Sequence, residues 1–78
     1  MALPTGNMLK AARALAGLTR AQLAAMAEID VSTISRMESA GPSSVGSHAR
    51  TVELVIRALR ARGVEITDDS VRLMKRPA

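Results

Sequence analysis

Cysteine and aromatic residues are absent: the sequence contains no Cys, Phe, Trp or Tyr. Without cysteine the chain cannot build a disulfide framework, a Cys-based zinc finger or a thiol redox site. Proteins that bind RNA or single-stranded DNA usually stack the bases on aromatic rings, so the lack of rings argues against these partners. The longest apolar run covers only residues 23–27, whereas a bilayer-spanning helix needs about 20 such residues. We therefore expect no membrane partner.

The composition that is present is typical of one small domain that interacts with a polyanion. Hydrophobic residues make up 47% of the 78 residues, too many for a disordered tail. Residues 1–63 hold eight basic and four acidic side chains, whereas residues 64–78 hold three of each. This basic excess favours binding to nucleic acid; a merely solvated surface is the alternative. We expect a cytoplasmic protein, unless residues 1–27, which are basic and lack acids, form a transit peptide.

Apolar residues that recur at helical spacing predict four helices, at residues 6–16, 20–27, 31–39 and 49–62. Gly17 and Gly63 follow the first and the last of these segments and supply left-handed C-terminal stops. Thr19 and Gln22 have the spacing of a capping box, which predicts where the second helix begins. Residues 40–50 are rich in Gly, Pro and Ser and therefore predict a loop.

The second and third helices are separated by only three residues, which fits a tight turn between two helices at a steep angle. Asp30, the last residue of this turn, is well placed to cap the third helix. On that helix Ile34 and Met37 form an apolar face, with Val31 at its flank. Small polar residues and Arg36 project from the opposite face.

After Gly63 the hydrophobic period changes to two, which predicts a β-hairpin. With Asp68 and Asp69 as the turn, apolar residues pair with apolar ones and Glu65 pairs with Arg72. A hairpin on its own is marginally stable in water, so this one must pack on the helices or pair with another chain. We expect pairing about a two-fold axis, with a shared apolar core of Val64, Ile66, Val71 and Leu73. Packing on the fourth helix, which leaves a monomer, is the alternative.

A helix, a tight turn and a short helix with small outward residues together predict a helix-turn-helix. The second of these helices must enter a groove about 12 Å wide, and small side chains let its backbone approach the bases. Ser32 and Ser35 can exchange hydrogen bonds with base edges, and Arg36 can bind guanine with two hydrogen bonds. Arg20 lies at the start of the second helix, where free N–H groups and the positive end of the helix dipole favour a phosphate.

Residues 8–40, MLKAARALAGLTRAQLAAMAEIDVSTISRMESA, resemble the XRE or lambda-repressor-like (Cro-type) helix-turn-helix family. The matching elements are LTRAQLA, the turn EID and the run STISRME. The resemblance implies a mainly α fold: a four-helix lambda-repressor-like domain, here followed by a short C-terminal β-hairpin. Where the family's turn often holds Gly, this sequence has Glu28, which must adopt an unusual backbone at a cost of about 1 kcal/mol. The Gly that usually follows the third helix is Ala40 here, with Gly41 one place later.

The resemblance also implies roles for individual residues. We expect base readout at the start and outer face of the third helix, by Val31, Ser32, Thr33, Ser35 and Arg36. Completion of the core is the alternative role for Val31. Phosphate contacts are expected from Thr19, Arg20, Gln22, Ser39 and Arg50. An Arg of the first helix meets the Glu that closes the third, which gives a structural ion pair between Arg13 and Glu38.

These features predict a sequence-specific regulator of transcription that binds double-stranded DNA. We expect a repressor that acts as a homodimer on a palindromic site, in the bacterial cytoplasm or nucleoid. Residues 1–63 would bind DNA, and residues 64–78 would form the dimerisation hairpin and a basic tail. Two alternatives stay open: an antitoxin with a toxin as partner, and an interaction adaptor that does not bind DNA. We find no nucleophile–base pair, phosphate loop or metal-ligand cluster, and His48 stands alone, so we predict no enzyme, no cofactor and no metal site.

Overall fold

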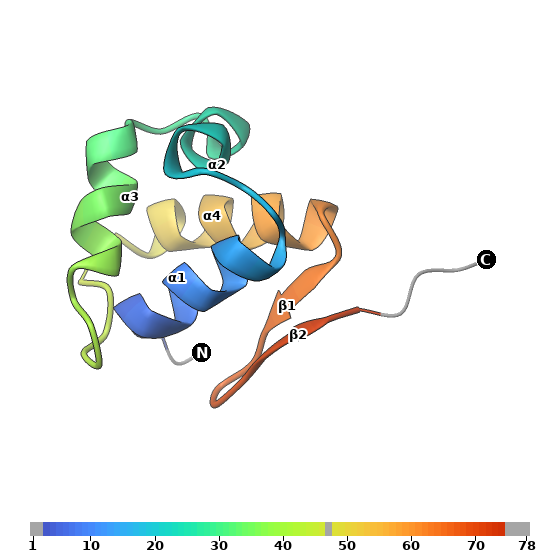
Figure 1. Cartoon of the computed structure of the whole chain (residues 1–78). Helices are drawn as coiled ribbons and strands as arrows, with labels where there is room; N and C mark the ends of the chain where they lie inside the picture. The colour runs from blue at the N-terminus through green and yellow to red at the C-terminus, as the bar shows by residue number, and fades with distance from the viewer. Residues whose placement is uncertain (1–2, 47, 75–78) are drawn as a thin grey trace.

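The computed structural model describes residues 3–46 and 48–74 of the chain. In this part four helices precede a two-stranded antiparallel hairpin (Figure 1). The elements in chain order are α1 (Gly6–Leu15), α2 (Arg20–Ala27), α3 (Val31–Glu38), α4 (Ala49–Ala61), β1 (Val64–Ile66) and β2 (Val71–Leu73). The predicted fold, mainly helical with a C-terminal hairpin, is confirmed. The observed ends of the elements differ from the predicted ones by at most one residue.

Local signals set both ends of α1. The Thr5 side chain accepts a hydrogen bond from the backbone N of Met8 at 3.1 Å and caps the start of the helix. Gly17 follows the helix with a φ of 72°, a left-handed conformation that glycine adopts without steric cost. There the backbone N of Leu18 donates to the carbonyl of Arg13 at 3.1 Å. This bond satisfies a carbonyl that the end of the helix would otherwise leave unpaired.

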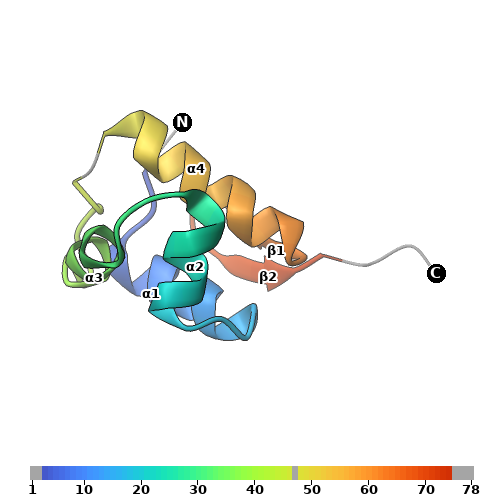
Figure 2. The same ribbon diagram turned by 90° about the horizontal axis from the view of Figure 1, so that it is seen from above.

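One hydrophobic core lies between the helices and β1. Helix α2 packs on both α3 and α4. Helix α1 packs on α3 and on the hairpin. In Figures 1 and 2, α3 lies at one side of the molecule and the hairpin at the other. The largest fully buried side chains are aliphatic or Met: Leu9, Leu23, Ile34, Met37, Val55, Leu59 and Val64. Each contributes about 1.5–3 kcal/mol by leaving water, and the flexible methionine fills the irregular space that no ring occupies.

The loop after α3 pairs with the chain just before α1. The backbone N of Val45 donates to the carbonyl of Pro4 at 3.1 Å, and that of Gly6 donates to the carbonyl of Ser43 at 3.1 Å. At Gly6 the two segments are so close that a Cβ would lie 2.7 Å from three backbone atoms, the carbonyl oxygens of Met37 and Glu38 and the nitrogen of Gly41. Only glycine fits there. Residues 43–45 of the predicted loop are thus held by hydrogen bonds to residues about 40 positions earlier.

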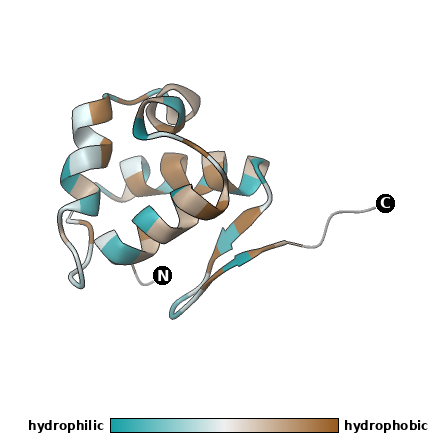
Figure 3. Ribbon diagram, in the orientation of Figure 1, coloured by the Kyte–Doolittle hydropathy of each residue, from teal (hydrophilic) through white to brown (hydrophobic). Residues whose placement is uncertain are grey.

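The hairpin has the predicted register. The partners are Val64 with Leu73, Glu65 with Arg72, and Ile66 with Val71. Both strands alternate between hydrophobic and hydrophilic residues (Figure 3). Across them Arg72 Nε donates to Glu65 Oε1 at 2.8 Å. At the turn, Thr67 and Ser70 are linked through both backbone and side-chain hydrogen bonds, which compensates for the absence of the glycine that such turns favour.

The hairpin packs on the helices of its own chain, which corrects one of the expected roles. Strand β1 contacts both α1 and α4, and Val64 is 0% exposed within the single chain. Val64 begins β1 directly after Gly63, close to the end of α4, and its side chain packs in the core of the domain. Val64 therefore has no surface left for a second subunit. Of the four residues predicted for dimerisation, Ile66 and Val71 are half-buried and Leu73 is 60% exposed.

The longest helix of the described part, α4, has 13 residues. None of the helices described there has the length and apolar character needed to cross a membrane.

Candidate nucleic-acid interface

The turn between α2 and α3 sets the angle between these helices. Glu28 caps the end of α2 with φ 58° and ψ 44°, the left-handed conformation expected from the resemblance. The backbone N of Ile29 then donates to the carbonyl of Ala24 at 3.0 Å. Asp30 occupies the N-cap position of α3, but its side chain makes no capping hydrogen bond. The predicted side-chain cap is wrong because Asp30 Oδ2 accepts a hydrogen bond from the Ser32 hydroxyl instead, at 2.8 Å.

The outer face of α3 is open to solvent. Ile34 and Met37 are buried, whereas Ser32, Ser35 and Arg36 are exposed. Val31 is 43% exposed, so it does not complete the core, and a role in contacting a ligand stays a prediction. Thr33 is half-buried at the edge of this face. Four of the five residues expected to read bases therefore lie on one exposed surface, and Thr33 borders it.

Arg36 lies at a hollow between α3 and the start of α4. The hollow has a volume of about 460 Å³ and is lined by Thr33, Arg36, Val45, Gly46, His48 and Thr51. Thr51, the residue of α4 at this hollow, was not singled out from the sequence. No spacing signal could have found it, because the way the helices pack in the domain decides which part of α4 lines the hollow with Arg36.

The start of α2 is held by a capping box. Thr19 Oγ1 accepts from the backbone N of Gln22 at 3.1 Å, and Gln22 Oε1 accepts from the backbone N of Thr19 at 2.9 Å. Both side chains are exposed. Their oxygens serve the helix, which leaves the Thr19 hydroxyl hydrogen and the Gln22 amide N–H groups as the donors that these side chains can offer to a ligand.

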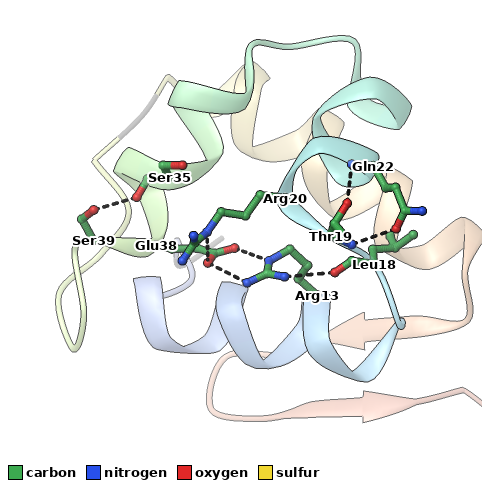
Figure 4. Close-up of polar contacts among 8 residues, drawn as sticks. All are labelled: Arg13, Leu18, Thr19, Arg20, Gln22, Ser35, Glu38 and Ser39. Carbon is green, nitrogen blue, oxygen red and sulfur yellow. Dashed lines mark hydrogen bonds and ion pairs between the residues drawn. The ribbon is translucent and has the colours of Figure 1, made fainter.

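Arg13, Arg20 and Glu38 meet between α1, α2 and α3 (Figure 4). Arg13 binds the carboxylate with two nitrogens: Nε donates to Oε2 at 2.7 Å, and Nη2 donates to Oε1 at 3.1 Å. Arg20 Nε donates to Oε1 as well, at 3.1 Å. The contact between Arg20 and Glu38 was not expected from the sequence, because the two residues are 18 positions apart and belong to different helices.

The carboxylate of this cluster is charged although it is buried. Burial by itself would raise the pKa of Glu38, but the hydrogen bonds from Arg13 and Arg20 outweigh it and bring the pKa below its usual value of 4.5. The hydrogen bond to Glu38 in turn raises the pKa of Arg13, against the opposing effect of desolvation. Two positive groups and one negative group leave this cluster with a net charge of +1.

The remaining candidates lie around α3 rather than in one cluster. The hydroxyl of Ser39 donates to the carbonyl of Ser35 at 2.7 Å, at the C-terminal end of α3. Arg50 lines a groove between α2 and α4 of about 540 Å³, together with Glu28 of the turn before α3. Arg20 contacts the last residue of α3, so Arg20 and Arg50 lie towards opposite ends of that helix. Within residues 3–46 and 48–74 no three His, Asp or Glu side chains gather as a metal site would require.

A model of the helix-turn-helix family matches residues 9–45. The match begins within α1, includes α2, the turn and α3, and ends at Val45 in the following loop. No curated protein and no solved structure matches the chain.

Proposed function

Since the chain contains a helix-turn-helix domain of the XRE and lambda-repressor-like family at residues 9–45, a family of DNA-binding regulators, we propose that it recognises specific sequences in double-stranded DNA and represses transcription. The observation that supports this is the outer face of α3, where Val31, Ser32, Ser35 and Arg36 are exposed and the small serines let the backbone approach base edges. We assign no enzymatic step and no cofactor to it. Its site of action is the DNA of the cytoplasm or nucleoid.

Specificity in this proposal comes from α3. Arg36 is exposed and can place two parallel N–H groups on the O6 and N7 atoms of a guanine. Ser32 is the weaker reader, because its hydroxyl must first give up or share its bond to Asp30. The exposed methyl groups of Val31 suit the C5 methyl of thymine.

Affinity comes from phosphates on either side of α3. Arg20 lies at the start of α2 and Arg50 near the start of α4, so each is placed to meet one edge of the groove that α3 enters. If a dimer neutralises roughly six phosphates, the logarithm of the binding constant falls with the logarithm of salt concentration at a slope near −5.

We propose that the protein binds as a homodimer. Among residues 3–46 and 48–74, no strand pairs with the outer edge of β2, and Leu73 in this strand is 60% exposed. A second copy could cover both about a two-fold axis. To reach two half-sites one turn of DNA apart, the two α3 helices must lie about 34 Å from each other, and so roughly 17 Å from the two-fold axis. The longest dimension of the chain is 36 Å, so a dimer that joins at the hairpins can span this distance.

The experiment that tests DNA recognition begins with selection of bound duplexes from a random library. Arg36→Ala is then expected to weaken binding to the selected site by about 1–3 kcal/mol and to relax preference at one base pair in each half-site. The matched control is Arg62→Ala, which removes the same charge at the far end of α4 from α3. If Arg36→Ala and Arg62→Ala weaken binding by the same amount, on the selected duplex and on random duplexes alike, Arg36 contributes only non-specific charge. Absence of any salt-dependent binding by the wild type would favour the adaptor instead.

Leu73→Glu tests the dimer without disturbing Val64. Because Leu73 is largely exposed in the single chain, the variant is expected to fold but to sediment as a monomer, and to lose operator affinity while weak non-specific binding persists. A wild-type protein that sediments as a monomer at tens of micromolar contradicts the proposed interface.

A further inference from the structure

We infer that Glu38 is a positioning residue for DNA binding: it anchors Arg20 by its Nε atom and thereby aims the rest of the Arg20 guanidinium at a phosphate. This inference rests on the proposed function, because it gives a second role to the arginine that we place at the DNA backbone. Glu38 itself is buried and does not touch the DNA.

The two arginines at Glu38 use their donors differently. Arg13 donates from Nε and Nη2 to the carboxylate and from Nη1 to the carbonyl of Leu18 at 3.0 Å, and its side chain is only 15% exposed. Arg20 donates to Glu38 from Nε, and its side chain is 47% exposed. Within the described residues, no hydrogen-bond acceptor lies at the Nη atoms of Arg20. Arg13 is therefore a structural partner, whereas Arg20 has its terminal donors available.

Charge explains why two arginines share one carboxylate. A lone glutamate beside Arg20 would cancel the charge that attracts a phosphate. Here Arg13 already binds both oxygens of Glu38, so the carboxylate is compensated before Arg20 is counted. The cluster keeps a net charge of +1, and the exposed member, Arg20, presents it. The bidentate geometry that a guanidinium offers to a phosphate remains possible through its two Nη atoms.

Anchoring raises affinity because a free arginine loses rotamer freedom when it binds. Fixing such a side chain beforehand is worth about 2- to 12-fold in affinity. The anchor is also the last residue of α3. The Arg20 guanidinium, which belongs to α2, is therefore fixed in position relative to α3, the helix that enters the groove.

A double-mutant cycle on Arg20 and Glu38 tests the inference, with the selected duplex as the probe. Arg20→Ala is expected to weaken binding and to reduce the salt slope by about one unit. In a Glu38→Gln background the loss caused by Arg20→Ala should become smaller by about 2- to 12-fold. An equal or larger loss in that background overturns the inference, because it means that Glu38 withholds Arg20 from the DNA or does not affect it.

Two further variants separate positioning from stability and from charge. Glu65→Gln makes the same chemical change at the hairpin and should leave the effect of Arg20→Ala unchanged. Arg20→Lys keeps the charge but has one nitrogen, which cannot hold Glu38 and present a fork to phosphate at once. It is expected to bind the duplex several-fold more weakly with an almost unchanged salt slope. Full affinity for this variant contradicts the inference. All binding is measured at a temperature where circular dichroism shows each variant to be folded.

The Nε–Hε resonance of Arg20 gives a direct readout. We expect its chemical shift to differ from that in Glu38→Gln and to persist when the duplex is added, because Nε stays on the carboxylate. If adding DNA moves the Nε–Hε chemical shift of the wild type to the value seen in Glu38→Gln, Arg20 has left the carboxylate, which refutes the inference. If the wild type binds DNA and Arg36→Ala loses specificity while the cycle shows no coupling, the proposed function stands and this inference alone fails.

Discussion

Glu38→Gln is expected to destabilise the fold far more than an ordinary surface substitution. The carboxylate side chain is 3% exposed and accepts three hydrogen bonds, two of them from Arg13. Breaking one partner of a buried ion pair costs about 3–5 kcal/mol. The glutamine amide keeps one oxygen as an acceptor, and Arg13 keeps some contact with water. Arg20 is half-exposed, so its pair contributes little to stability. We therefore expect a loss of about 2–4 kcal/mol.

A loss of this size is a large fraction of the stability of so small a domain, which is expected to total about 4–12 kcal/mol. It corresponds to a fall in Tm of about 10–25 °C. The assay is thermal and urea unfolding at pH 7 followed by far-ultraviolet circular dichroism, because the chain has no aromatic residue to report by fluorescence.

The matched control is Glu65→Gln. Glu65 also pairs with an arginine, at 2.6 Å, but Arg72 is 67% exposed, so this change should cost less than about 1 kcal/mol. If the two variants lose the same small amount, below about 1 kcal/mol, the Arg13–Glu38 pair does not hold α1 and α3 together and the reasoning is refuted.

Three further outcomes can be checked with the same unfolding assay. Gly6→Ala should destabilise the protein by about 3 kcal/mol, because its Cβ would meet backbone atoms at 2.7 Å that cannot move aside; a neutral result would contradict the close approach of α1 to the loop after α3. Glu28→Gly should stabilise it by about 0.5–1 kcal/mol by relieving the left-handed φ of 58°, whereas Glu28→Ala should give no such gain. Because folding lowers the pKa of Glu38 below its unfolded value of 4.5, the ionised carboxylate stabilises the fold fully above pH 4.5, and this stabilisation is lost as the pH falls through the folded pKa. Glu38→Gln should therefore remove this part of the acid dependence of stability, and a variant with an unchanged acid profile would contradict the lowered pKa.

The helices and the hairpin could be predicted because their signals are local. The capping box at Thr19 and Gln22 and the stop at Gly17 act over three or four residues, so the chain needs no distant partner to begin or end these helices. The register of the hairpin follows from the period of two, since a slip by one residue would place Glu65 and Arg72 on the apolar face. Asp30 shows the limit of such rules: it stands at the capping position, but its neighbour Ser32 supplies a competing hydrogen-bond donor.

Placement of side chains between elements required the tertiary structure. Val64 and Leu73 face each other in the hairpin and look alike in the sequence, yet the first is buried and the second is 60% exposed. The difference arises because β1 lies against both α1 and α4, whereas β2 packs on α1 in a way that leaves Leu73 largely exposed. In the same way, Val31 has the hydrophobicity of a core residue, but its position at the start of α3 leaves it 43% exposed.

The sequence by itself determined the helix-turn-helix, the outward face of α3 and the candidate readers on it, because these depend on hydrophobic period, capping and a three-residue turn. Only the tertiary structure decided that Arg20 lies on Glu38 and that Arg36 lines a hollow together with Thr51 of α4. It also decided that Gly6 must be glycine. Each of these brings together residues more than ten positions apart in the chain, and such arrangements depend on how the packed core orients whole helices. No local pattern along the chain encodes that orientation.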